Sequence, residues 1–98
     1  MADFYDELET RDPGVRERDL FAALPGQVSH AMNAAPGWAR HLAGVDAMQV
    51  NSRDALARLP VLRKSELKDL QEAEPPLGGF AAGGPETWGR IFMSPGPI

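Results

Sequence analysis

Nine prolines are spread along the 98 residues of this chain, and they limit the length of every regular element that it can form. Proline has no amide N–H and its ring clashes with the preceding helical turn, so it starts, kinks or ends a helix. We therefore expect a mainly α-helical fold of several short helices joined by Pro/Gly breaks. One short β-strand is expected near the C-terminus.

The first helix is predicted to begin at Pro13, with Asp12 as its N-cap, and to run to about residue 24. Pro25 is interpreted as a new start or a kink, because it cannot donate to the preceding turn. Apolar residues then recur at helical spacing as far as residue 35. The pair Pro36-Gly37 marks the next break and opens a further short helix.

Two more helices are expected in the second half of the chain. Asn51 or Ser52 can cap a short helix, which Pro60 ends. The segment RKSELKDLQEA, residues 63–73, is the clearest amphipathic helix of the sequence. In it Leu67 and Leu70 are predicted to face inward.

The composition divides the chain into three parts. Residues 1–12 form an acidic N-terminal arm, residues 13–74 a helical subdomain, and residues 75–98 a Gly/Pro-rich loop with a short strand over residues 89–93. The last 27 residues hold six glycines and five prolines, so this part cannot bury much apolar surface by itself. We therefore expect it to pack on something else.

Charge and composition exclude several classes of function. The net charge of −4 resides in the first 19 residues, and no basic stripe is present, which argues against nucleic-acid binding. No apolar run approaches the length of a membrane span, and the acidic N-terminus does not resemble a secretory signal. The chain has no cysteine, which fits a cytoplasmic protein.

Candidate chemical motifs are weak. The stretch GGFAAGG, residues 78–84, lacks the Lys-Ser or Lys-Thr of a phosphate loop and the spacing of a dinucleotide fingerprint, so it is interpreted as a flexible connector. His30 and His41 have no third ligand at metal-binding spacing, and a solvated or hydrogen-bonded role is expected for both. The residues themselves therefore predict no catalytic or metal site.

An ordered set of segments resembles the opening of the phenylacetate–coenzyme A ligases, a branch of the adenylate-forming acyl-CoA synthetases. The segment LPGQVSHAMNAAPGWARHLAGVD (residues 24–46) is similar to an early helical part of that family, and SRDALARLPVLRKSELKDL (residues 52–70) to the next element. PLGGFAA (residues 76–82) and RIFMSPGPI (residues 90–98) follow in the same order. The resemblance covers nearly the whole chain and about the first quarter of such an enzyme.

The resemblance implies the N-terminal subdomain of a larger α/β enzyme, which adenylates a carboxylic acid with ATP and Mg²⁺ and transfers the acyl group to coenzyme A. Ser94 and Gly96 would lie in its nucleotide loop. Pro95 and Pro97 each remove a backbone donor from that loop, and we interpret the sequence as a divergent branch rather than a degenerate site. Arg63 replaces a helix-capping Ser or Thr, so a weaker cap is expected there.

Two kinds of function remain open at this point. As part of a ligase, the isolated chain would be inactive, would bind no cofactor itself, and would pack on the remainder of the enzyme. The alternative is a small helical interaction or dimerisation module. In that case Phe4, Tyr5, Trp38 and the acidic arm would dock on a partner, which includes a second copy of the chain in a homodimer.

Overall fold

The protein is mainly α-helical in a computed structural model, which describes residues 3–95. Four α-helices form within this range, and each lies where the sequence predicts helix. Single turns of 3-10 helix precede, separate and follow them. The elements in chain order are η1 (Glu7–Thr10), α1 (Pro13–Ala34), α2 (Pro36–His41), η2 (Ala47–Gln49), α3 (Arg53–Ala57), α4 (Lys64–Ala73) and η3 (Pro85–Thr87).

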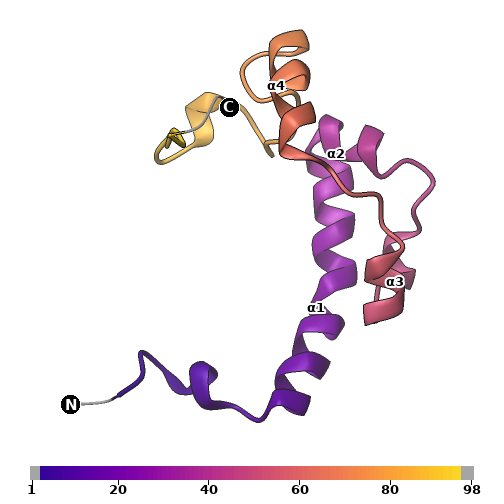
Figure 1. Cartoon of the computed structure of the whole chain (residues 1–98), viewed down its shortest axis with the longest axis vertical. Helices are drawn as coiled ribbons and strands as arrows, with labels where there is room; N and C mark the ends of the chain where they lie inside the picture. Colours follow the sequence, from indigo (N-terminus) through magenta and orange to yellow (C-terminus); the bar gives the residue numbers. More distant parts are fainter. Residues whose placement is uncertain (1–2, 96–98) are drawn as a thin grey trace.

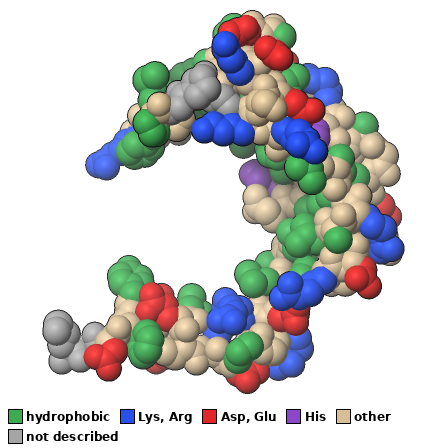
Figure 2. All heavy atoms as spheres, viewed as in Figure 1, with side chains coloured by type: hydrophobic (Ala, Val, Ile, Leu, Met, Phe, Trp, Pro, Cys, Tyr) green, Lys and Arg blue, Asp and Glu red, His purple; other side chains and the backbone are tan. Residues whose placement is uncertain are grey.

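The helices are arranged as an open C around one long helix (Figure 1). Helix α1 is the spine, and α2 and η2 pack against it. The chain then returns along α1 through α3 to α4 (Figure 1). The acidic arm and the C-terminal segment leave the spine at opposite ends and extend to the same side of the molecule, which leaves the space between them open (Figure 2).

Helix α1 begins as the sequence predicts but does not stop at its internal proline. The Asp12 carboxylate accepts a hydrogen bond from the Val15 amide at 3.1 Å, and Pro13 occupies the first turn. The helix continues through Pro25, which is buried inside it, so the new start considered for this residue is wrong. The hydrogen bonds on either side, together with packing of the buried ring, compensate for one missing amide donor.

The hydrophobic core is small and lies where α1, α2 and η2 meet. Half-buried side chains surround its few buried residues, and Leu59 after α3 belongs to this shell. A core of this size buries little of the chain's apolar surface, so most of the helical surface is exposed. Besides Pro25, the buried hydrophobic residues among those described are Val28, Ala35, Leu42 and Val50.

A close contact between two glycine-containing turns joins α2 to the segment after α4. The Gly37 amide donates to the Gly79 carbonyl at 2.7 Å, and Gly78 and Gly79 both adopt positive φ angles. Arg40 reinforces this contact because Nη2 lies 2.5 Å from Glu74 Oε2 and 3.3 Å from the Gly78 carbonyl. The beginning of the glycine-rich stretch is therefore a packed turn, and its interpretation as a plain flexible connector is wrong.

Aromatic packing extends this contact. Trp38 meets Phe80 edge to face with ring centroids 5.1 Å apart, and it meets His41 in the same manner at 5.8 Å. His41 Nε2 donates in turn to the Pro60 carbonyl at 3.0 Å. Trp38 is thus half-buried within its own chain, and only part of its side chain remains exposed for the partner contact predicted for it.

Helix α4 has the predicted position and a weaker N-terminal cap, as expected. The Arg63 side chain has no acceptor atom, and only the reciprocal contact forms, in which Glu66 Oε2 accepts from the Arg63 amide at 3.0 Å. Leu67 is half-buried, but Leu70 is exposed, so the inward orientation predicted for it is wrong. The chain packs too little protein against this end of the helix to cover both leucines.

The strand predicted over residues 89–93 does not form. This segment is irregular, and its apolar side chains are exposed, with Met93 reaching 91%. A strand needs a neighbour to accept and donate its backbone hydrogen bonds, and the described part of the chain offers no partner strand here. None of the helices within residues 3–95 combines the length and apolar character required to cross a bilayer.

Candidate functional site

The most developed concave surface is a groove between the first half of α1 and α3. Its apolar floor consists of Leu20, Phe21 and Leu24 from α1 and Leu56 from α3. The hollow has a volume of about 490 Å³ and is half open to solvent. Because Leu20 and Leu56 are exposed there, the groove presents apolar surface that the chain itself does not cover.

Local sequence determines where α3 begins, and two longer-range contacts hold it beside α1. Ser52 Oγ accepts from the Ala55 amide at 3.1 Å and begins the helix at Arg53, as the sequence predicts. Leu59 then packs against the core and fixes the far end of this segment. An ion pair between Arg53 Nε and Glu17 Oε1 ties the two helices together across the groove.

The rim of the groove is predominantly basic. Arg16 lines the main hollow, and an adjoining hollow of about 650 Å³ continues over Arg18. Arg53 and Glu17 line both, so the joint rim carries three guanidinium groups against one carboxylate. We call this surface, floor and rim together, the α1/α3 groove.

The polar side chains that line the α1/α3 groove are arginine, glutamate, asparagine and serine. Its serine, Ser52, already uses the hydroxyl oxygen to cap α3. Nucleophilic catalysis requires a base within hydrogen-bond reach of the nucleophile, and the groove lining supplies no histidine beside this serine. Among residues 3–95, no three His, Asp or Glu side chains gather as a metal-ligand set.

Within the acidic N-terminal arm, residues 3–10 form the second notable surface, and from here on the arm means these residues. Phe4, Tyr5 and Leu8 are exposed, and the single turn η1 buries none of its residues. The arm keeps its shape through local contacts: Asp6 Oδ1 accepts from the Leu8 amide at 2.9 Å, and Glu9 Oε2 accepts from the Tyr5 amide at 2.8 Å.

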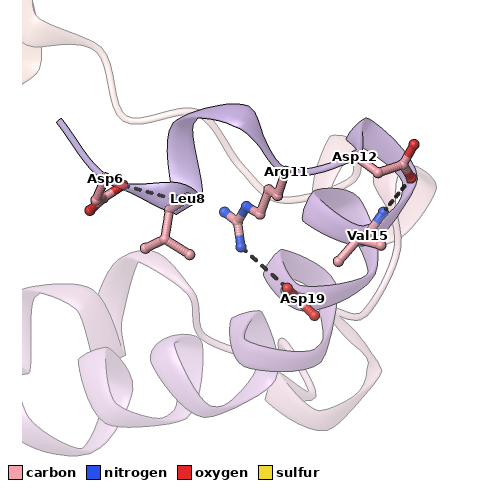
Figure 3. Close-up of polar contacts among 6 residues, drawn as sticks. All are labelled: Asp6, Leu8, Arg11, Asp12, Val15 and Asp19. Carbon is pink, nitrogen blue, oxygen red and sulfur yellow. Dashed lines mark hydrogen bonds and ion pairs between the residues drawn. The ribbon is translucent and has the colours of Figure 1, made fainter. Parts of the chain in front are cut away.

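Figure 3 shows how the base of the arm is fixed to α1. Arg11 Nη1 lies 3.2 Å from Asp19 Oδ2, and the Asp12 carboxylate caps the helix one residue later. These two contacts hold the arm at an angle to the helix. The arm therefore extends away from the side of α1 on which α3 lies (Figure 1).

The predicted nucleotide-loop residue Ser94 does not line the groove. Ser94 is exposed in the irregular C-terminal segment, next to Pro95, which has no amide to offer a phosphate. Gly96 lies outside the described residues. His30 is exposed on α1 and His41 is hydrogen-bonded on α2, which agrees with the roles expected for them.

Sequence reasoning missed the groove although one of its signals was visible. The spacing of Leu20, Phe21 and Leu24 marks an apolar face of α1, and such faces normally lie against a core. That this face would lie opposite Leu56, and remain half open, depends on the course of the chain between residues 35 and 53. No local pattern specifies that course.

Comparison with known proteins adds no relationship to this geometry. The chain matches no protein-family model, no curated protein and no solved structure.

Proposed function

We propose that this chain is the N-terminal helical segment of an ATP-dependent aryl- or acyl-CoA ligase similar to phenylacetate–coenzyme A ligase. The observation that carries the proposal is the combination of a small core with extensive exposed apolar surface. The groove and residues 91–93 expose large apolar side chains, and α4 exposes Leu70. Such a surface fits a subdomain that packs against a larger body.

The enzyme of this proposal activates a carboxylic acid as an acyl-adenylate with ATP and Mg²⁺ and then transfers the acyl group to coenzyme A. It would work in the cytoplasm, where both cosubstrates are found. The 98 residues would supply structure rather than chemistry, because no nucleophile–base pair occurs in the groove. Ser94 and Gly96 would become part of a nucleotide loop only when further residues surround them.

The reading frame downstream of Ile98 provides the direct test. We expect it to continue into a long α/β sequence, and the protein it encodes to release pyrophosphate from ATP when phenylacetate and coenzyme A are added. The 98-residue chain assayed alone should release none. A stop codon after Ile98, or turnover by the isolated chain, would contradict the proposal.

A second candidate function is that of an interaction or dimerisation module, and the acidic arm favours it. Tyr5 is 91% exposed and Phe4 56% exposed, beside acidic residues that keep the segment hydrated. Aromatic side chains in such a setting are frequent anchors of protein interfaces. A stable, folded chain in circular dichroism and gel filtration that ends at a stop codon would support this function over the ligase.

A further inference from the structure

We propose that two copies of this chain dimerise by exchanging their arms, so that residues 3–10 of each copy lie in the α1/α3 groove of the other. The proposal identifies the partner of the interaction module and does not depend on the ligase proposal. Three independent properties of arm and groove support it: their charge, their apolar content and the direction in which the arm extends.

Charge is complementary between the two surfaces. The arm carries four carboxylates and no basic residue, whereas the groove rim carries three guanidinium groups and one carboxylate. Because one of those guanidinium groups already pairs with Glu17, Arg16 and Arg18 are the ones available to an incoming acid. Opposite charges on two facing patches guide their encounter and fix their register.

Apolar content is also matched. Phe4, Tyr5 and Leu8 are 56%, 91% and 61% exposed, and the groove floor offers leucine and phenylalanine side chains to them. Large aromatic residues bury roughly 150–250 Å² each, so docking would cover about 400 Å² of the surface of one arm. With the facing groove surface and the second arm included, the total is about 1,600 Å², the size of a standard specific interface.

The direction in which the arm extends favours the groove of a second copy over the groove of the same chain. The Arg11–Asp19 ion pair and the Asp12 cap hold the arm away from the side of α1 that carries α3 (Figures 1 and 3). Folding back into its own groove would require the arm to break both contacts. Reciprocal exchange keeps them, and it closes the assembly as a two-fold dimer that uses each surface once.

The experiment uses two charge variants of the 98-residue chain. In the groove variant, Arg16→Glu and Arg18→Glu reverse the net charge of the rim, and in the arm variant Asp3→Lys and Glu7→Lys cancel the net charge of the arm. These positions avoid the carboxylates that shape the arm, Asp6 and Glu9. The mass of each sample is followed by sedimentation equilibrium from 1 to about 200 µM, and far-ultraviolet circular dichroism reports whether each variant keeps its helices.

We expect the unmodified chain to dimerise in this range and each variant alone to weaken dimerisation at least tenfold. An equimolar mixture of the two variants should dimerise again, because the unaltered arm of the groove variant then meets the unaltered groove of the arm variant, and the new lysines of the other arm face the new glutamates. Recovery on mixing cannot come from a misfolded protein. A chain that stays monomeric at 200 µM, variants that dimerise as well as the unmodified chain, or a mixture that stays monomeric would each overturn the proposal.

Discussion

Replacing Gly37 by alanine places a methyl group in a space that the backbone of the glycine turn already occupies. A Cβ atom at this position would lie 2.7 Å from the Gly78 carbonyl oxygen and 2.8 Å from the Gly79 carbonyl carbon. Both neighbours are backbone atoms, so neither can rotate away as a side chain would. The two segments must separate, and the hydrogen bond from the Gly37 amide to the Gly79 carbonyl must lengthen or break.

The expected cost follows from three terms. Inserting a methyl group into a packed site costs about 1–3 kcal/mol. Loss of the backbone hydrogen bond adds about 1 kcal/mol. Alanine in place of glycine in a helix returns up to about 1 kcal/mol. The free energy of unfolding should therefore fall by about 2 kcal/mol.

Urea unfolding followed by tryptophan fluorescence measures this change. A Trp88→Phe background leaves Trp38 as the reporter, and Trp38 lies against Phe80, next to the contact in question. The free energy of unfolding of a small protein falls by about 1–3 kcal/mol per molar urea, so a loss of about 2 kcal/mol should lower the urea midpoint by about 1 M.

Gly26→Ala is the matched control. Gly26 also lies in a helix, but a Cβ atom there would meet nothing within 4 Å. The substitution should stabilise the chain by up to about 1 kcal/mol through helix propensity alone. If Gly37→Ala raised the midpoint as Gly26→Ala does, the close contact between the two glycine turns would be refuted.

Two further experiments test the Asp12 cap and the Arg40–Glu74 ion pair. Asp12→Ala should lower the free energy of unfolding by about 1 kcal/mol, because the Val15 amide loses its acceptor. Asp12→Asn keeps an acceptor and should retain most of that stability. Equal losses for the two variants in thermal unfolding would rule out the cap. A double-mutant cycle with Arg40→Ala and Glu74→Ala should give a coupling below about 1 kcal/mol, since both side chains are more than half exposed. That coupling should shrink in 1 M NaCl, and a salt-independent value would show that burial rather than charge joins the two segments.

Helix positions could be predicted from the sequence because short-range chemistry determines them. Asp12 and Ser52 accept hydrogen bonds from amides three residues ahead, so their effect is visible in the sequence itself. The weak cap at Arg63 was predictable for the same reason, since arginine has no acceptor. Pro25 was the exception, because α1 continues through it with the proline ring buried although the residue has no amide donor.

Only one side of the candidate groove could be predicted from the sequence. The apolar face of α1 is visible as a helical period, but its partner Leu56 is more than thirty residues away. Likewise, the glycine-rich stretch was interpreted from its composition, which reports flexibility and not what the turn packs against. The strand over residues 89–93 failed for a related reason: its residues favour an extended backbone, but a strand also requires a neighbour.

The sequence by itself therefore determined where the helices begin, apart from the new start considered at Pro25, and where the acidic arm lies. These properties depend on residues within one or two helical turns of each other. Only the tertiary structure decided that α3 lies across α1, that Gly37 meets Gly79, and that Trp38 packs inside the molecule while the arm stays exposed. Contacts of this kind depend on the whole path of the chain, which no short segment encodes.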